Sequence, residues 1–276
     1  MESLGQILKR IGQNRSGSSS SPLASSSEQN RNGLPKTVPP LPPDCPKCQD
    51  EGGAWRSKGL VNHIEDVVWR PCDCPSAQLK VEERQAKLVL AAALPRSVPP
   101  RTFANFKVLK GTEEAFEVTK CYAENPYATP ILTLTGASGC GKTHLLEAIG
   151  RRTLERQIYT RYTVAASLLD LLRASFDHDG DKFQDIFDRY DRADLLILDD
   201  PGAEKATPWA IEKLFSLVNN RCLNGCPLAI GTNLDFKTMR EHLGPRTADR
   251  IWDTGSGLVT VVSITAGSYR TGARAE

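Results

Sequence analysis

Residues 136–143 read Gly-Ala-Ser-Gly-Cys-Gly-Lys-Thr, and this stretch decides the fold of the chain. An apolar run, Ile131 to Thr135, precedes it, and a helical pattern that begins at His144 follows it. A strand, a glycine-rich turn and a helix N-terminus in this order bind phosphate, because the glycines let successive backbone N–H groups face an anion. The chain is therefore predicted to bind a nucleoside triphosphate through nine consecutive residues: Gly136, Ala137, Ser138, Gly139, Cys140, Gly141, Lys142, Thr143 and His144.

Two side chains of this loop carry the chemistry. We expect the Lys142 ammonium group to contact the β- and γ-phosphates and to neutralise charge on the oxygens during phosphoryl transfer. We expect the Thr143 hydroxyl to hold Mg²⁺, a cation that prefers oxygen ligands. Lys142 is accordingly the first predicted catalytic residue.

Polar side chains end two further apolar runs. The run 195–198 (Leu-Leu-Ile-Leu) ends in Asp199 and Asp200, and the run 228–231 leads to Asn233. Runs of this kind are typical of buried parallel strands, whose carboxyl ends meet at one edge of the sheet. We expect Asp199 to bind Mg²⁺ through its water shell and Asp200 to orient or deprotonate the attacking water. Asn233 is predicted to hydrogen-bond that water or the γ-phosphate.

The composition favours a soluble globular protein. The 276 residues are 39% hydrophobic and 25% charged, which is ordinary for such a domain. No apolar run approaches the roughly eighteen residues that cross a bilayer, and the start of the chain lacks the pattern of a signal peptide. We therefore expect a cytoplasmic protein without a membrane partner. A net charge of +2 is too small to argue for nucleic-acid binding by itself.

The chain divides into five predicted parts. Residues 1–12 are a short amphipathic stretch that either docks on a partner as a helix or frays. Residues 13–43 are rich in Ser, Asn and Pro, which predicts a disordered linker. Residues 44–75 hold a cysteine cluster, residues 76–98 form a connecting helix and linker, and residues 99–276 form the nucleotide-binding domain.

The cysteine cluster predicts a small zinc module. Cys45 and Cys48 have the C-x₂-C spacing that places two thiolates on one tetrahedral ion. Cys72 and Cys74 are more tightly spaced, and His63 between the pairs can replace one of them. Four unlinked cysteines are the alternative, but the segment has few apolar residues around which to fold without Zn²⁺.

From residue 99 onward, predicted strands and helices alternate, which indicates an α/β fold with a parallel sheet covered by helices. Further strands are expected at 159–164 and 259–264, and a helix is expected to start at Thr207-Pro208, with Pro at its first position. Twelve residues follow the last strand, too few for a C-terminal helical lid. We therefore expect a neighbouring subunit to complete the nucleotide site.

Six motifs together resemble the bacterial DnaC/DnaI-like replicative helicase loaders, AAA+ ATPases whose relatives include the IstB transposition helpers. The matching stretches are 99–106 (Pro-Pro-Arg-Thr-Phe-Ala-Asn-Phe), 136–143, 199–205, 232–234, 249–251 and 267–270. The cysteine module resembles the DnaI-type amino-terminal domain. The resemblance implies an ATP-dependent loader that oligomerises with ATP between subunits and places a replicative helicase on single-stranded DNA. An IstB-like regulator of a transposase, or an adaptor that binds ATP with negligible turnover, are the alternatives.

The resemblance also implies roles for individual residues. Arg250 matches the arginine finger that acts on the neighbouring subunit's ATP, with Arg246 as the alternative. Phe103 and Phe106 match the segment that cradles the base, although plain core packing would explain them too. Two departures are Pro201 after the paired aspartates and a glycine, Gly231, where the family commonly has Thr or Ser.

Overall fold

A computed structural model describes residues 53–61, 64–176, 180–202 and 207–269. The chain divides into two compact units, Met1–Lys87 and Leu88–Glu276, and the division falls within helix α2 (Pro75–Ala92). The connecting helix predicted within residues 76–98 corresponds to α2. The predictions for residues 1–12 and 13–43, and the predicted zinc ligands Cys45, Cys48 and His63, lie outside the described residues.

In the first unit, the described residues before α2 form a β-hairpin. Strand β1 (Gly53–Val61) pairs antiparallel with β2 (Ile64–Pro71), from Gly53 opposite Pro71 to Val61 opposite Ile64. The cysteine spacing predicted a metal module here but no strands. The apolar run in the second strand, Val67 to Trp69, is too short for periodicity to distinguish a strand from a loop.

The second unit contains a five-stranded parallel sheet, as the alternating pattern predicted. Its strands are β3 (Ile131–Gly136), β4 (Thr160–Val164), β5 (Leu195–Asp199), β6 (Leu228–Thr232) and β7 (Val259–Ile264). The strand order is β4-β5-β6-β3-β7, and every pairing is parallel. All five carboxyl ends therefore lie at one edge of the sheet. The order places the end of β3 beside the ends of β6 and β7, and the end of β5 beside that of β6.

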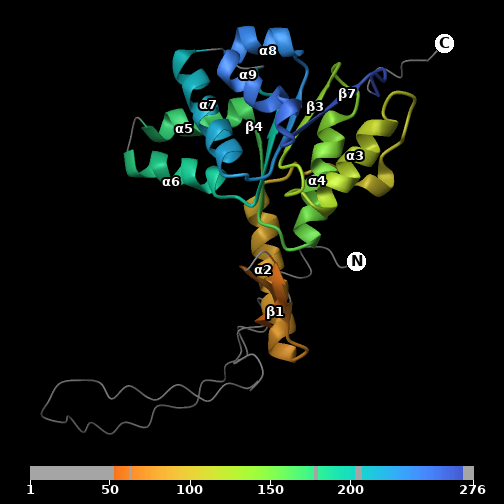
Figure 1. Cartoon of the computed structure of the whole chain (residues 1–276), viewed down its shortest axis with the longest axis vertical. Helices are drawn as coiled ribbons and strands as arrows, with labels where there is room; N and C mark the ends of the chain where they lie inside the picture. Colours follow the sequence, from red (N-terminus) through yellow and green to blue (C-terminus); the bar gives the residue numbers. More distant parts are fainter. Residues whose placement is uncertain (1–52, 62–63, 177–179, 203–206, 270–276) are drawn as a thin grey trace, which may run out of the picture. The chain divides into compact units, whose positions relative to one another are not determined.

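Helices cover both faces of this sheet (Figure 1). On one face lie α3 (Glu113–Glu124) and α4 (Lys142–Glu155). On the other face lie α5 (Ala165–Phe176), α6 (Gly180–Asp191), α7 (Pro208–Leu223) and α9 (Pro245–Trp252), with α8 (Phe236–Leu243) against α9. Short 3-10 turns lie at Phe103–Asn105 and Thr254–Ser256. Thr207 accepts a hydrogen bond from the Ala210 N–H and caps α7, whose first residue is proline as predicted.

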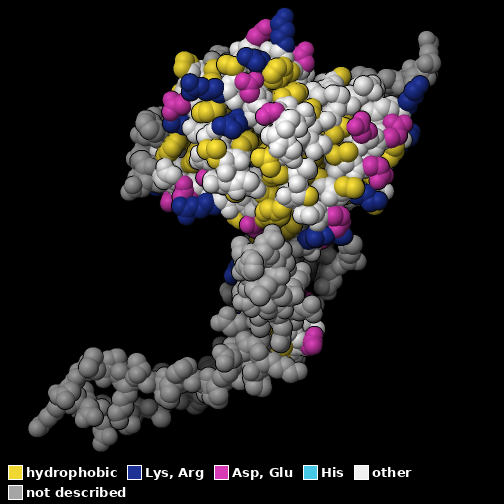
Figure 2. Space-filling model, in the orientation of Figure 1, with side chains coloured by type: hydrophobic (Ala, Val, Ile, Leu, Met, Phe, Trp, Pro, Cys, Tyr) yellow, Lys and Arg dark blue, Asp and Glu magenta, His cyan; other side chains and the backbone are white. Residues whose placement is uncertain are grey.

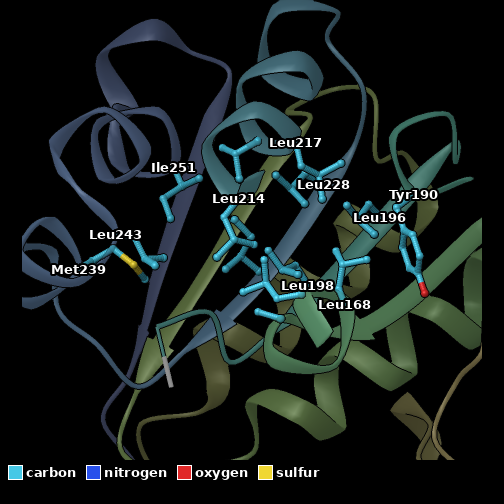
Figure 3. Packing of buried hydrophobic residues seen from close by; sticks show 14 of the residues in the cluster. Leu168, Tyr190, Leu196, Leu198, Leu214, Leu217, Leu228, Met239, Leu243 and Ile251 are labelled. Atoms are coloured by element: carbon cyan, nitrogen blue, oxygen red, sulfur yellow. The ribbon is translucent and has the colours of Figure 1, made fainter. Parts of the chain in front are cut away.

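The side chains of each strand alternate between two hydrophobic cores. Leu196 and Leu198 of β5 pack with α5, α7 and α9, whereas Leu195 and Ile197 pack with α3 and α4. Figure 3 shows the first core, in which leucines of β5, β6 and α7 interdigitate beside Met239 and Ile251. The period of two in a strand makes this division, and burial on both sides explains why the strands read as continuous apolar runs.

A buried arginine fixes the amino edge of the sheet. Arg221 of α7 is fully buried, and its guanidinium donates to the carbonyls of Tyr190, Asp191, Ala193 and Pro227 at 2.6–3.1 Å. Two of these carbonyls end helix α6, where the dipole favours a cation. Burial lowers the pKa of this guanidinium, while Cys226, Tyr122 and Asp191 nearby raise it in part. Arg221 therefore ties α6 and α7 to the start of β5 and β6.

The visible surface of the second unit carries both signs of charge. Figure 2 shows basic and acidic side chains interspersed over this face, with no broad region of one sign. Among the described residues, no helix combines the length and apolar character that crossing a membrane requires.

Candidate nucleotide-binding site

The predicted phosphate-binding loop joins β3 to α4 at the carboxyl edge of the sheet. Gly141, immediately before α4, has a φ of 109°, a left-handed conformation that disfavours other residues. A Cβ there would also lie 3.0 Å from the Phe106 ring and 3.3 Å from the Tyr269 ring. The loop therefore requires glycine here for two reasons, backbone conformation and close packing of aromatic rings.

Lys142 joins the loop to the neighbouring strand. Its side chain is buried, and Nζ donates to the carbonyls of Gly136 and Ala137 at 2.8 and 2.9 Å. A third bond runs to Asn233 Oδ1 at 2.6 Å, just past the end of β6. The ammonium group is thus held by oxygen acceptors of two strand ends, in the middle of the site.

A hydroxyl pair orients the first carboxylate. Thr143 Oγ1 donates to Asp199 Oδ2 at 2.9 Å, and the Tyr162 hydroxyl donates to the same oxygen at 2.6 Å. Burial, with the Asp199 carboxylate second, raises the pKa of Tyr162 well above its ordinary value, so the phenol keeps its proton and remains a donor. Asp199 itself is buried at the end of β5. Thr143 and Asp199, the two predicted magnesium ligands, are therefore adjacent.

The second carboxylate has a special backbone conformation. Asp200 has a φ of 54°, in the left-handed region, and its N–H donates to the Gly231 carbonyl at 2.7 Å. Short polar residues tolerate this region better than others, and such strain persists where the surrounding structure holds it. Asn233 Nδ2 donates to Asp200 Oδ1 at 3.1 Å. Burial raises the pKa of the Asp200 carboxyl, Asp199 raises it further, and Lys142 lowers it.

Gly231 explains how this strand end fits together. A Cβ at this position would lie 2.7 Å from Leu146 Cδ1 and 3.1 Å from Asp199 Oδ1. Leu146 of α4 is fully buried and fills the space that a side chain would occupy. Glycine at this position, where the family commonly has Thr or Ser, is therefore matched by a large residue on the facing helix.

Aromatic side chains form the other wall of the site. Phe106 stacks on Phe116 with ring centroids 5.7 Å apart, and its edge meets the rings of His144 and Tyr269 at 5.0 and 5.8 Å. The Tyr269 N–H donates to the Gly139 carbonyl at 3.0 Å, so the chain after β7 lies directly on the loop.

Phe103 and His144 have supporting positions. Phe103 packs edge-on against Phe116, 6.0 Å between centroids, and does not line the cavity of the site. Of the two phenylalanines predicted to cradle the base, Phe106 alone lines this cavity. His144 Nε2 lies 3.0 Å from the Thr102 carbonyl, which can only accept, so this nitrogen carries the hydrogen.

The phosphate-binding loop, the polar strand ends and two of the aromatic rings surround one cavity of about 410 Å³. Its lining residues come from the loop, the strand ends and the segments before α3 and after β7: Arg101, Asn105, Phe106, Lys107, Ser138, Gly139, Gly141, Lys142, Thr143, His144, Val164, Asp199, Asp200, Asn233 and Tyr269. One end is aromatic, and the other carries a lysine, two carboxylates, a threonine hydroxyl and an amide. This arrangement can hold a base, a phosphate chain and a hydrated divalent cation.

The predicted finger arginines lie at the opposite edge of the sheet. Arg246 and Arg250 are exposed on α9 and line a separate cavity of about 510 Å³. That cavity includes Ile131 and Val259, the first residues of β3 and β7. Neither arginine forms an ion pair with another described residue. The structure therefore does not bring Arg250 to the phosphate-binding loop of its own chain.

Several residues of the site were not predicted from the sequence. Tyr162, Tyr269, Lys107 and Arg101 line the cavity or contact its carboxylates. Tyr162 offered one signal, a hydroxyl inside a strand expected to be buried. Tyr269 belonged to a motif that carried the resemblance but had no assigned role.

The described part of the cysteine module contains one hydrogen bond to a predicted zinc ligand. Cys74 Sγ accepts a hydrogen bond from the Ala77 N–H at 3.3 Å at the start of α2. Cys72 and Cys74 are both partly exposed. Among the described residues, no three or more His, Cys, Asp or Glu side chains are grouped to hold a metal.

The fold and the site together define a P-loop nucleotide-binding domain of the AAA+ type. The family of IstB-like ATP binding proteins matches residues 122–276, more than half of the chain. The chain therefore belongs to this family, and the resemblance seen in the sequence motifs is confirmed.

Relatives in bacteria and phage-like elements share this domain. The chain is 28% identical over 223 residues to the phage-like element PBSX protein XkdC of Bacillus subtilis (strain 168), covering 74% of this chain and 77% of XkdC. It is 28% identical over 201 residues to the uncharacterized protein YdaV of Escherichia coli (strain K12), covering 69% of this chain and 81% of YdaV.

Solved structures show the same fold. AMPPCP-bound DnaA from Aquifex aeolicus superimposes with a TM-score of 0.54 at 25% identity, covering 62% of this chain and about half (51%) of that chain. The DnaC helicase loader superimposes with a TM-score of 0.53 at 20% identity, covering 60% of this chain and 97% of that chain. These neighbours confirm an α/β fold with a parallel sheet flanked by helices.

Proposed function

We propose that this protein is an ATP-dependent loader of a replicative DNA helicase onto single-stranded DNA. One observation supports this proposal most directly. Five polar side chains line one cavity at the carboxyl edge of the sheet: Lys142, Thr143, Asp199, Asp200 and Asn233. These are the groups that phosphoryl transfer from ATP to water requires. The partner and the DNA substrate rest on the relationship to loaders, supported by the fold shared with DnaC and DnaI.

Each of these groups has a proposed role in hydrolysis. Lys142 would contact the β- and γ-phosphate oxygens, and Thr143 and Asp199 would hold Mg²⁺, which would supply positive charge at those oxygens. Asp200 accepts a proton from the attacking water. The water oxygen bonds to the γ-phosphorus as the bond between that phosphorus and the leaving oxygen of ADP breaks. Asn233 reaches both Lys142 and Asp200, so it fixes their relative position and can sense the γ-phosphate.

Phe106 and Tyr269 complete the ATP site at its other end. Their rings line the same cavity as the loop, where they can contact a flat base. Burial of Phe106 against Phe116 fixes that wall before any nucleotide arrives. Phe103 then acts as a support for Phe116 and does not contact the base.

ATP hydrolysis is proposed to need two subunits. Arg250 and its neighbour Arg246 lie at the sheet edge remote from their own loop, where they are exposed. A head-to-tail assembly would place the finger edge of one subunit at the loop edge of the next, and such heterologous contacts form rings or helical filaments. Binding of ATP would favour this assembly, and hydrolysis would release the helicase.

The amino-terminal module is proposed to hold the helicase and to bind one Zn²⁺. Its ligands would be Cys45, Cys48 and two of His63, Cys72 and Cys74. The C-x₂-C spacing and the N–H···S contact at Cys74 support this proposal.

A regulator of a DNA transposase is the second candidate, because the matching family takes its name from IstB. The DnaI-like cysteine module favours the loader. The two candidates differ in the DNA that should stimulate hydrolysis: single-stranded DNA for the loader and duplex DNA for the regulator.

Two variants and two DNA substrates test the function. ATP turnover should rise with single-stranded DNA and should fall by about 10²-fold or more in Lys142→Ala, because a preorganised charge at the phosphates is lost. Asp200→Asn should retain ATP binding but lose turnover. Lys237 is an exposed residue of α8, so Lys237→Ala serves as the control and should behave as the wild type.

The outcomes separate the candidates. Stimulation by duplex DNA alone would favour the transposase regulator. A fully functional Asp200→Asn protein that loads helicase without turnover would favour the adaptor. Unchanged turnover in Lys142→Ala would refute the assignment of the ATP site.

A further inference from the structure

A buried carboxylate on the phosphate-loop helix holds an arginine at the nucleotide cavity. Glu147, in the second turn of α4, is fully buried. Its Oε1 accepts from Arg101 Nη1 at 2.6 Å, and its Oε2 accepts from Ser97 Oγ at 2.7 Å. Arg151 Nη2 lies 3.8 Å from Oε2. A buried carboxylate is costly unless it is paired and hydrogen-bonded, so this cluster fixes both ends of the 97–101 segment.

The geometry of Arg101 leaves donors for a further acceptor. Glu147 binds Nη1, and no described residue accepts from Nε or Nη2. The side chain is 40% exposed and lines the cavity beside Lys142 and Thr143. A guanidinium has five N–H donors in a planar fork that suits phosphate oxygens. The Arg101 side chain is therefore anchored on one side and available on the other.

Charge at the cavity favours an anion beside this group. Of the charged lining residues, Arg101, Lys107 and Lys142 are basic, and Asp199 and Asp200 are acidic. The two carboxylates lie at the end where a divalent cation is proposed, which leaves the basic groups to the phosphates. Glu147 neutralises part of the Arg101 charge but, with Arg151 also near it, does not cancel it.

We propose that Arg101 binds the phosphate chain of the nucleotide from within the same subunit, with Glu147 and Ser97 as its positioning residues. This inference rests on the proposed function, since it requires ATP in this cavity. It gives the phosphates a second contacting cation besides Lys142, contributed by the segment before α3. That cation acts in binding and is independent of any finger from a neighbour.

The segment around Arg101 follows the phosphate-loop helix over its length. Leu94 packs against Gly150, the Pro95 carbonyl accepts from Arg151 at 3.3 Å, and the Thr102 carbonyl accepts from His144. A phosphate contact by Arg101 would therefore also tighten residues 94–106 against α4.

A matched pair of variants tests the inference. Arg152, also paired to a carboxylate at 2.6 Å, has a 42% exposed side chain but does not line the cavity. Arg101→Met and Arg152→Met thus remove arginines of similar exposure, although Arg152 pairs with two exposed carboxylates and Arg101 with a buried one. ATP and ADP affinities are measured for the full-length protein with fluorescent nucleotide analogues, at two ionic strengths and with Tm recorded in parallel.

Arg101→Met should weaken ATP binding by about 10-fold, the size expected when one half-exposed charge-assisted hydrogen bond is lost. Its affinity should also depend less on ionic strength, because one charge contact is gone. Arg101→Lys should recover part of the affinity. Arg152→Met should leave both the affinity and its salt dependence unchanged.

Three results would overturn the inference. One is an Arg101→Met protein with wild-type affinity. Another is a loss of ATP affinity in Arg152→Met equal to that in Arg101→Met. The third is a loss of ATP affinity in Arg101→Met with an unchanged dependence on ionic strength, because a lost charge contact must lower that dependence. If the wild-type protein binds no nucleotide, the proposed function fails instead.

Discussion

Arg250→Ala should leave ATP binding intact and abolish DNA-stimulated turnover. Arg250 lines a cavity with the first residues of β3 and β7, whereas the phosphate-binding loop follows Gly136, the last residue of β3. Five residue steps along a strand span about 16 Å at about 3.3 Å each. An extended arginine side chain covers less than half of that span. Arg250 therefore cannot reach the phosphates of its own chain, and any catalytic contact must be made to a neighbouring subunit.

The expected magnitude follows from this separation. An arginine finger supplied in trans accelerates phosphoryl transfer by about 10³–10⁵-fold. Loss of an interaction made only in the transition state lowers kcat and kcat/KM together and leaves ground-state binding unchanged. ATP affinity of the Arg250→Ala subunit should therefore stay within about twofold of the wild type, while its turnover should fall by about 10³-fold or more.

Mixing two inactive proteins provides the decisive assay. In an equal mixture of Arg250→Ala and Lys142→Ala, some interfaces combine an intact loop from one protein with an intact finger from the other. With random head-to-tail assembly, about a quarter of the interfaces are competent, so about a quarter of the wild-type turnover should return. Arg246→Ala is the matched control: it lies one helical turn away on α9 and lines the same cavity.

Two results would refute the shared-site reasoning. Normal turnover of Arg250→Ala would remove it as the finger, and loss of turnover in Arg246→Ala instead would transfer the role to that residue. A mixture that stays inactive although both proteins enter mixed oligomers would argue against catalysis between subunits.

Two further predictions concern packing and metal. Gly231→Ala should lower the free energy of unfolding by about 1–3 kcal/mol through overpacking against Leu146. The loss should be smaller in a background of Leu146→Ala, and additive losses in chemical denaturation of the double variant would contradict the proposed contact. Elemental analysis of protein purified without chelators should find one zinc per chain, which a serine replacement of Cys45 and Cys48 removes. A metal-free wild-type protein would refute the zinc proposal.

The local sequence was sufficient to predict the parallel sheet and the polar residues at the ends of its strands. An apolar run, a glycine-rich turn and a helix start fix a phosphate-binding loop within about twenty residues, because each part depends mainly on its own backbone preferences. The runs before Asp199 and Asn233 predicted buried strands in the same way. Parallel strands align their carboxyl ends, so the residue pattern alone was enough to place these side chains at one edge of the sheet.

The amino-terminal hairpin and the aromatic wall were not predicted in this way. Strand pairing between β1 and β2 depends on partners across the hairpin, and a short mixed run gives no clear period. Phe106 and Tyr269 are 163 positions apart in sequence numbering, and only packing against Gly141 brings both rings to the loop.

By itself, the sequence determined the phosphate-binding loop, the five strands of the parallel sheet, the family, and the polar residues that end β5 and β6. Only the tertiary structure decided that Tyr162 orients Asp199, that Glu147 carries Arg101 to the cavity, and that Arg250 lies at the far edge of the sheet. The physical reason is the range of the interactions. Backbone preferences and hydrophobic periods act over a few neighbouring residues, whereas these side-chain contacts and edge positions depend on the order in which separate strands and helices pack.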